Sequence, residues 1–219
     1  MDNMRLADPT KTPKPRRLPA SAVLLWCAAL LALWFGAVTV CQNGGCQEFD
    51  ADRRVLAVLY SLRQPSLDAF FTAITWLGSI AVLLPAALAL AWRFWRKGQW
   101  AAALLLPASL GGAWVLAHIG KTLVDRPRPD LFPALINVPA DSSFPSAHTV
   151  QITAFALAWV LAPGTRRSWA GFIAAAATIL LVAVSRLYLQ VHYPSDVLVG
   201  LIVATGWVLG LRLALAGRT

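Results

Sequence analysis

The chain has 219 residues, of which 58% are hydrophobic and only 13% are charged. Soluble domains average about 25% charged residues, so this composition excludes an ordinary soluble domain and indicates an integral membrane protein. The formal net charge of +9 does not indicate a nucleic-acid partner, because the Lys and Arg residues lie in short segments between apolar runs rather than on one soluble face.

Six apolar runs, each bounded by charged residues, Pro or Gly, predict six transmembrane helices. The runs cover about residues 18–40, 67–92, 99–121, 146–161, 168–188 and 195–213. We therefore expect an all-α polytopic membrane protein whose single six-helix domain occupies residues 18–215. Residues 1–17 are polar and Pro-rich, and we expect them to form a disordered cytoplasmic tail. The first run is longer than the apolar region of a typical signal peptide, so we expect it to remain as a span.

The bias of Lys and Arg predicts the orientation of the six helices. If the N-terminus is cytoplasmic, 12 of the 19 cations lie on the cytoplasmic side, in the tail, in the loops after the second and fourth spans, and near the C-terminus. Both termini are then cytoplasmic, and the loops after the first, third and fifth spans face the outside. We expect this protein in the cytoplasmic membrane of a bacterium.

The first outside loop carries two local signals. Cys41 and Cys46 frame a Gln-Asn-Gly-Gly turn in an oxidising compartment, which favours a disulfide over two free thiols and leaves a metal site without other soft ligands. Cys27 lies inside the first span and is interpreted as a packing residue. Residues 48–63 have a rough helical stripe of apolar side chains, which predicts a short amphipathic helix on the outer membrane surface. The alternative for this segment is an ordinary ordered loop.

Three short polar clusters contrast with the apolar remainder of the chain. All three fall at the outside ends of predicted spans, although the topology was assigned without them. Charged groups at membrane depth are costly, so they indicate a functional site. The clusters are Lys121-x6-Arg128-Pro129, Pro145-Ser146-Ala147-His148 and Ser185-Arg186-x5-His192-x3-Asp196.

These clusters contain the groups needed to remove a phosphoryl group from an ester without a metal ion. Lys121, Arg128 and Arg186 can hold phosphate oxygens, because guanidinium forks match them and an ammonium group adds a point charge. Ser146 is predicted at a helix start, where its hydroxyl and free backbone N–H groups face an anion.

The two histidines have different roles in this hypothesis. His192 and Asp196 are four residues apart at a predicted helix start, so the carboxylate can orient the imidazole. The other ring nitrogen of His192 can then attack phosphorus, while His148 protonates the leaving oxygen and later activates water. A single His or Arg near a span end is more often structural. Ten specified positions in this order, however, arise by chance in fewer than about one chain in 100,000.

The three clusters resemble the signature of the type 2 phosphatidic acid phosphatase (PAP2) superfamily, which is K-x6-R-P, P-S-G-H and S-R-x5-H-x3-D. The resemblance spans about a third of the chain, and the six-span plan is similar to that of the membrane members. It implies a phosphatase without metal or cofactor, in which His192 is the nucleophile, Asp196 its partner and His148 the acid and base. Ala147 stands where the signature has Gly. The phosphate-binding residues implied by the resemblance are Lys121, Arg128, Ser146, Ala147 and Arg186.

The small six-span form resembles bacterial enzymes that act on undecaprenyl pyrophosphate and phosphatidylglycerol phosphate. We favour undecaprenyl pyrophosphate as substrate, with phosphatidylglycerophosphate and lipid A 1-phosphate as alternatives, and the site facing the outer leaflet. The expected partners are the phospholipid bilayer and a membrane lipid, without nucleic acid, and the sequence does not indicate an oligomeric state. A transporter or a non-catalytic lipid-binding protein is the alternative from another class. The broken midplane helices and paired halves typical of transporters are not evident in the sequence.

Five further polar residues lie near the clusters, and the sequence assigns them lesser roles. His118 lies one helical turn before Lys121 and is interpreted as a packed interfacial residue. Asp125 and Arg126 are expected to pair with each other or to guide headgroups. Asp130 and Asp141 are expected to be solvated loop charges.

Overall fold

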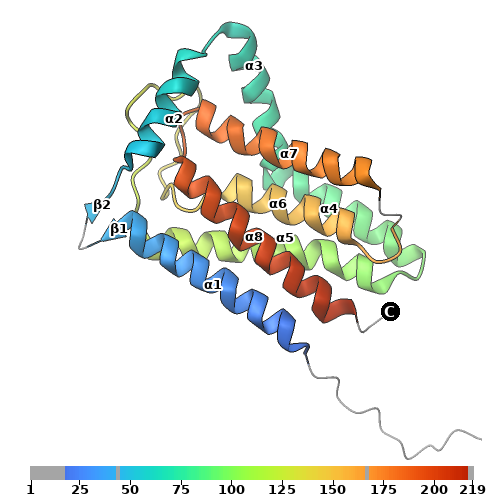
Figure 1. The fold of residues 1–219 in the computed structure, drawn as a ribbon. Coiled ribbons are helices and arrows are strands. Elements are labelled where there is room, and N and C mark those ends of the chain that lie inside the picture. Colours follow the sequence, from blue (N-terminus) through green and yellow to red (C-terminus); the bar gives the residue numbers. More distant parts are fainter. Residues whose placement is uncertain (1–17, 43–44, 166–167, 217–219) are drawn as a thin grey trace, which may run out of the picture.

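The computed structural model describes residues 18–42, 45–165 and 168–216. The tail predicted for residues 1–17 lies outside the described residues. Most of the described part of the chain is helical, as predicted, and two strands of two residues each form a short hairpin (Figure 1). Its elements are α1 (Ala20–Val40), β1 (Cys41–Gln42), β2 (Gly45–Cys46), α2 (Asp50–Ser61), α3 (Pro65–Ile74), the 3-10 helix η1 (Thr75–Gly78), α4 (Ile80–Arg96), α5 (Trp100–Leu123), α6 (Ala147–Leu161), α7 (Trp169–Tyr188) and α8 (Pro194–Ala216).

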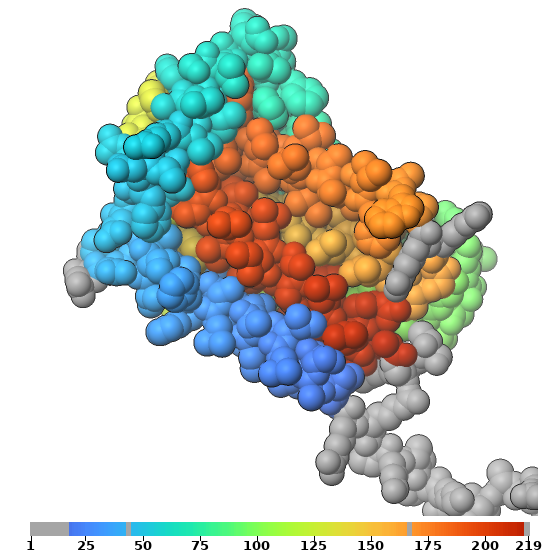
Figure 2. Space-filling view, viewed as in Figure 1, coloured from blue at the N-terminus to red at the C-terminus, as the bar shows by residue number. Residues whose placement is uncertain are grey.

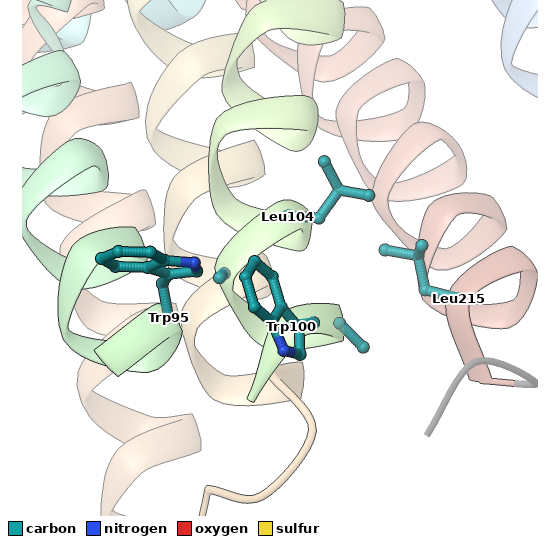
Figure 3. A pocket seen from close by; sticks show the side chains of 6 residues that line it. Trp95, Trp100, Leu104 and Leu215 are labelled. Carbon is teal, nitrogen blue, oxygen red and sulfur yellow. The ribbon is translucent and has the colours of Figure 1, made fainter. Parts of the chain in front are cut away.

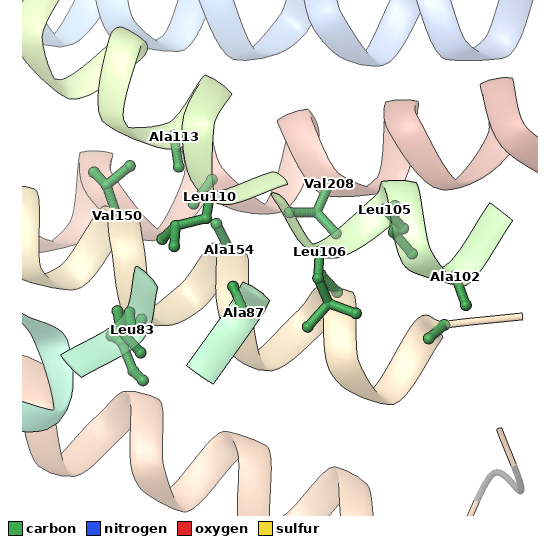
Figure 4. Close-up of a cluster of buried hydrophobic side chains, with 14 of the residues drawn as sticks. Leu83, Ala87, Ala102, Leu105, Leu106, Leu110, Ala113, Val150, Ala154 and Val208 are labelled. Atoms are coloured by element: carbon green, nitrogen blue, oxygen red, sulfur yellow. The ribbon is translucent and has the colours of Figure 1, made fainter. Parts of the chain in front are cut away.

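Helix α6 lies at the centre of the bundle and packs against α5, α7 and α8. Helix α1 packs along α8, and α4 packs along α5, so these two helices complete the outer layer. Small and branched apolar side chains fill the space between the helices; Figure 4 shows Leu83 and Ala87 of α4 facing Leu106, Ala154 and Val208. The central position of α6 explains why nine of its 15 residues are buried.

The expected number of spans is only partly matched by the described helices. Four of them, α1, α5, α7 and α8, are long and apolar enough to cross a membrane. The segment from α3 to α4 is bent by 47° and counts as a fifth span if its two parts are taken together. The bend occurs where Ser79 adopts an extended backbone and caps α4 by accepting a hydrogen bond from the Ala81 N–H. Helix α6 has only 15 residues and is shorter than a full span.

The first loop forms a covalently closed hairpin followed by a helix. Cys41 and Cys46 are joined by a disulfide across the paired strands β1 and β2. Cys27 is a free thiol on the exposed face of α1 rather than a packing residue. Helix α2 occupies most of the segment where the sequence predicts an amphipathic helix, and it buries Asp52 as well as Leu56. Figure 2 shows that α2 and α3 project beyond the bundle.

The two ends of the bundle carry different connections. At one end lie the hairpin, α2, the long loop of residues 124–146 and the α7–α8 turn (Figure 1). At the other end lie the α4–α5 and α6–α7 connections, the start of α1 and the end of α8 (Figure 1). An apolar cavity of about 340 Å³, lined in part by Trp95, Trp100, Leu104 and Leu215, lies at this second end (Figure 3). The polar clusters are at the first end.

Candidate active site

Four helix ends bring the three predicted clusters together. Lys121 is in the last turn of α5, and Arg186 is in the last turn of α7. Ser146 precedes α6 as its N-cap residue, and Asp196 is in the first turn of α8. Helices α5 and α7 run toward this end of the bundle and α6 and α8 leave it, so two C-terminal ends face two N-terminal ends. Clusters that are up to 75 positions apart in the chain therefore share one site.

Arg128 is the cation nearest to His192. Its Nη1 donates to the Val191 carbonyl over 2.8 Å and lies 3.3 Å from Nε2 of His192. A guanidinium group can only donate hydrogen bonds, so Nε2 is the acceptor in this contact and the imidazole proton belongs on Nδ1. This tautomer leaves a lone pair on Nε2, which is the requirement for a nucleophile.

Nδ1 of His192 faces the carboxylate of Asp196. The distance from Nδ1 to Oδ2 of Asp196 is 3.6 Å, which is too long for a hydrogen bond. Burial lowers the pKa of His192 well below its ordinary value of 6.5, and the charges of Arg186, Arg128 and Lys121 lower it further. The imidazole is therefore neutral near pH 7, the form that can attack an electrophile.

His148 lies within electrostatic reach of Arg186 and His192. It is the second residue of α6, and its ring packs near Gly78, where a side chain would meet His148 and Val182. Its imidazole has no hydrogen bond to any described residue. This second histidine is therefore placed in the same site with a ring that is free to exchange protons.

Arg186 is buried, and the charge of Asp141 acts on it, but no acid among the described residues lies within ion-pair distance. Its side chain is only 3% exposed. Nη1 donates to the Thr75 hydroxyl over 2.7 Å, while Nε has no partner in the described structure. A buried cation with unused donors is costly unless an anion completes it. This geometry favours Arg186 as an anion-binding residue.

Asp141 pairs with both of the remaining predicted phosphate-binding cations. Its Oδ1 lies 2.5 Å from Nη2 of Arg128, and its Oδ2 lies 3.1 Å from Nζ of Lys121. Lys121 also donates to the Ser142 carbonyl. Partial burial alone would raise the pKa of Asp141, but the hydrogen bonds and charges of Arg128 and Lys121 bring this pKa below its ordinary value. Asp141 is thus an exposed loop charge, as expected, but it also pairs with two of the predicted phosphate-binding cations.

Ser146 and Ala147 form the start of α6 at the floor of the site. Ser146 is fully buried, and its hydroxyl accepts a hydrogen bond from Thr149 over 3.0 Å rather than capping the helix. Its backbone N–H donates to the Asp196 carbonyl over 3.3 Å, which joins the starts of α6 and α8. Ala147 is the first residue of α6. Both residues lie where the sequence places them, at an N-terminal helix end that suits an anion.

Arg126 and Asp52 were not recognised as site residues from the sequence. Arg126 was expected to pair with Asp125 or to face headgroups, but it is 1% exposed and lies 2.5 Å from the Asp196 carboxylate. Its second acidic partner is Asp52 of α2, at 3.3 Å. Asp52 precedes Arg126 by 74 positions, so no local pattern indicates the pair. The only available signal was that Arg126 lies two residues before Arg128 inside a recognised cluster.

A small polar pocket adjoins Lys121 between α5 and α6. Its volume is about 130 Å³, and its lining includes His118, Lys121, Asp141 and Gln151. Gln151 is 6% exposed, and its amide has no hydrogen-bond partner among the described residues. His118 is exposed and stacks on Trp114 with 5.3 Å between ring centroids. Within the described ranges, no group of three His, Cys, Asp or Glu residues is arranged to hold a metal ion.

This helical membrane fold, with its cation-rich site around two histidines, defines a class of membrane phosphatases. The family model described as the PAP2 superfamily matches residues 102–218, which is more than half of the chain. The protein therefore belongs to the PAP2 superfamily and is a phosphatase, as its signature predicts. The matched region includes all three polar clusters and begins in α5.

Named relatives are also phosphatases. Phosphatidylglycerophosphatase B of Bacillus subtilis is 31% identical over 157 residues, covering 68% of this chain and 76% of the relative. Decaprenylphosphoryl-5-phosphoribose phosphatase of Mycobacterium tuberculosis is 42% identical over 103 residues, covering 45% of this chain and 51% of that relative. The chain is thus similar to two phosphatases whose names specify different lipids.

Two solved structures share the fold. The first transmembrane PAP2-type phosphatidylglycerolphosphate phosphatase from Bacillus subtilis superimposes with a TM-score of 0.71 and 27% identity, covering 91% of this chain and 96% of that chain. Aquifex aeolicus LpxE superimposes with a TM-score of 0.62 and 27% identity, covering 75% of this chain and 96% of that chain. The similarity therefore extends beyond the family-model region to the N-terminal helices.

Proposed function

We propose that this protein is a metal-independent lipid phosphatase that forms a phosphohistidine on His192. The observation that carries the proposal is the group of cations around Nε2 of His192. Arg128 lies 3.3 Å from this atom, and the charges of Arg186 and Lys121 act on the same imidazole. Such a group of cations can hold the phosphate oxygens and stabilise the charge that develops on them in the transition state.

The proposed reaction has two displacement steps. In the first, Nε2 of His192 forms a bond to phosphorus as the bond to the leaving oxygen breaks, and His148 gives its proton to that oxygen. In the second, His148 takes a proton from water, the water oxygen bonds to phosphorus, and the N–P bond breaks to release inorganic phosphate. Asp196 stabilises the positive charge that His192 gains while it carries the phosphoryl group.

We propose a particular lipid substrate from the names of the relatives and from the residues that line the polar pocket beside Lys121. The sequence-based preference for undecaprenyl pyrophosphate rests on the small six-span form alone. The names of the two curated relatives specify phosphate carried on glycerol or on ribose. The pocket beside Lys121 offers the Gln151 amide as donor and acceptor, which suits the hydroxyl groups of such a linker. We therefore place phosphatidylglycerophosphate first, undecaprenyl pyrophosphate second and lipid A 1-phosphate third.

We further propose that the protein acts in the cytoplasmic membrane with its site toward the outer leaflet. The cation bias of the sequence supports this orientation. The three clusters lie at the end of the bundle that carries the disulfide, and disulfides persist in oxidising compartments. The bilayer and its phosphorylated lipids are then the partners of the protein.

The proposal is tested by phosphate release from the three candidate lipids. Purified protein in mixed micelles should release inorganic phosphate in the presence of EDTA, and orthovanadate should inhibit as a mimic of five-coordinate phosphorus. Asp50→Asn is a control, because Asp50 is exposed on α2 and has no role in the two steps. A requirement for added divalent metal would contradict the mechanism. Lipid binding without any phosphate release would favour the non-catalytic alternative.

A further inference from the structure

Arg126 differs from Arg128 because its acidic partners, Asp52 and Asp196, are both buried, whereas the acidic partner of Arg128 is the exposed Asp141. Nη1 donates to Oδ1 of Asp196 over 2.5 Å and to the Ser195 hydroxyl over 2.8 Å. Nη2 donates to the Gln47 carbonyl over 2.9 Å and to Oδ2 of Asp52 over 3.3 Å. Both terminal nitrogens are therefore occupied by protein acceptors from α2, α8 and the segment that precedes α2.

The guanidinium is also held from one side by an aromatic ring. Its central carbon lies 4.1 Å from the centroid of the Tyr193 ring. The side chain of Arg126 is 1% exposed, so this cation–π contact is formed away from solvent, where such contacts are strongest. Arg126 is fixed in one orientation by contacts on its two nitrogens and on its face.

Asp52 of α2 accepts hydrogen bonds from Ser195 in the first turn of α8. The Ser195 N–H donates to Oδ1 of Asp52 over 2.9 Å, and the Ser195 hydroxyl donates to Oδ2 over 2.5 Å. An aspartate that accepts from the second N–H of a helix normally belongs to the N-cap residue of the same helix. Here the N-cap position is Tyr193, which has no suitable side chain, so a distant helix supplies the acceptor. Asp196 accepts from the Tyr193 N–H over 2.9 Å through Oδ2.

We propose that Arg126 and Asp52 are positioning residues for the nucleophile, and that α2 is thereby part of the catalytic apparatus. Arg126 binds Oδ1 of Asp196, which leaves Oδ2 directed at the start of α8 and at Nδ1 of His192. Asp52 holds the opposite side of the guanidinium and the Ser195 residue next to Asp196. The proposal rests on the proposed role of His192 as the nucleophile.

The charges of Asp196, Arg126 and Asp52 explain why the proposed positioning of His192 needs all three residues. Asp196 and Asp52 are 0% and 3% exposed, so each carboxylate needs a partner to remain ionised inside the protein. Arg126 is the cation between them, and the row of charges is negative, positive and negative. Removing Arg126 leaves two buried carboxylates without a counter-charge, which favours protonation of one of them. A protonated Asp196 cannot stabilise the charge on His192.

The test uses Arg126→Met and Asp52→Asn, with Arg54→Met and Asp50→Asn as controls. Both control residues are exposed on α2, so they repeat the same chemical changes outside the network. We expect kcat to fall about 10- to 100-fold in the two network variants, by analogy with partners that orient catalytic ligands. KM and the inhibition constant of inorganic phosphate should change less than about twofold, because the cations that hold phosphate are untouched. Arg126→Lys should recover part of kcat, since it keeps the charge but not the fork.

A spectroscopic measurement separates positioning from a general loss of structure. The chain has 3 histidines, so the ¹⁵N resonances of histidine-labelled protein can be assigned with His118→Ala and His148→Ala. The wild-type His192 should show the tautomer with its proton on Nδ1, and Asp52→Asn should shift the Nδ1 resonance, because the Asp196 carboxylate that faces this atom is no longer held in place. Arg54→Met and Asp50→Asn should leave the His192 resonances unchanged.

Two results would overturn the proposal. One is a wild-type kcat in Arg126→Met or Asp52→Asn. The other is a network variant with lower kcat whose His192 Nδ1 resonance is that of the wild type. If Arg126→Met does not fold, Asp52→Asn and Ser195→Ala carry the same test with smaller changes. The NMR measurement does not depend on turnover, so an inactive wild-type protein would contradict the proposed function without obscuring this result.

Discussion

Asp141 places its Oδ1 atom 2.5 Å from Nη2 of Arg128, on a cation that the family signature assigns to phosphate. Its Oδ2 atom lies 3.1 Å from Nζ of Lys121, so the two carboxylate oxygens are held as two phosphate oxygens would be. A phosphate group that binds these cations must therefore compete with an internal anion. The side chain of Asp141 is 50% exposed, which leaves it free to turn toward solvent.

Replacing Asp141 with Asn should tighten the binding of anions. The amide removes the competing charge while it keeps the shape of the side chain, so KM and the inhibition constant of orthovanadate should both fall about two- to tenfold, corresponding to about 0.4–1.4 kcal/mol. Asp130→Asn is the matched control, because Asp130 is exposed in the same loop and should give wild-type constants. Weaker binding of vanadate to Asp141→Asn would show that the carboxylate supports the site instead of competing with its ligand.

The acid sensitivity of the site follows from the lowered pKa of His192. Burial and the charges of Arg186, Arg128 and Lys121 place this pKa below the ordinary value of 6.5. His192 should therefore stay neutral below pH 6.5 in the folded protein, whereas an unfolded chain would already bind a proton. The contribution of this group to stability is thus lost as the pH falls below 6.5. An NMR titration checks the prediction, and a midpoint of His192 at or above 6.5 would contradict it.

His148→Ala should affect substrates according to their leaving groups. An alkoxide of high pKa needs a proton from His148, whereas a nitrophenolate leaves without one. We expect kcat for a lipid phosphate to fall by at least about 100-fold, and kcat for a nitrophenyl phosphate to fall less. The comparison requires rates for several leaving groups in wild type and variant. Equal losses for all leaving groups would exclude His148 as the general acid of the first step.

Sidedness can be measured by thiol labelling in intact spheroplasts. A Cys at Asn137, in the loop between α5 and α6, should react with a membrane-impermeant reagent on a background without native cysteines. A Cys at Thr165, in the α6–α7 connection, should react only after lysis, because this connection is at the opposite end of the bundle (Figure 1). Labelling at Thr165 alone in intact cells would move the reaction to the cytoplasmic leaflet.

The helices and the predicted site were accessible from the sequence because their signals are local. Long apolar runs indicate α1, α5, α7 and α8 directly. The bend between α3 and α4 was missed, because an apolar run continues through Ser79 and hydropathy does not detect a change of direction. The short length of α6 was visible, but its burial at the centre depends on packing by three other helices.

The missed site residues depend on contacts between distant parts of the chain. Asp141 lies in a long loop without periodic sequence, so its approach to Arg128 could not be deduced from spacing. Arg126 and Asp52 meet only because α2 folds back onto the start of α8.

The most direct test of the central claim is to identify the residue that becomes phosphorylated. Wild-type protein is mixed with a lipid carrying a labelled terminal phosphate, quenched in alkali within the first turnovers and digested, because phosphohistidine survives base. We predict that the label is found on the peptide that contains His192 and is absent from His192→Ala. His148→Ala should retain the label longer, since hydrolysis of the intermediate needs His148 as a base. A label on His148, or phosphate release by His192→Ala at the wild-type rate, would contradict the account.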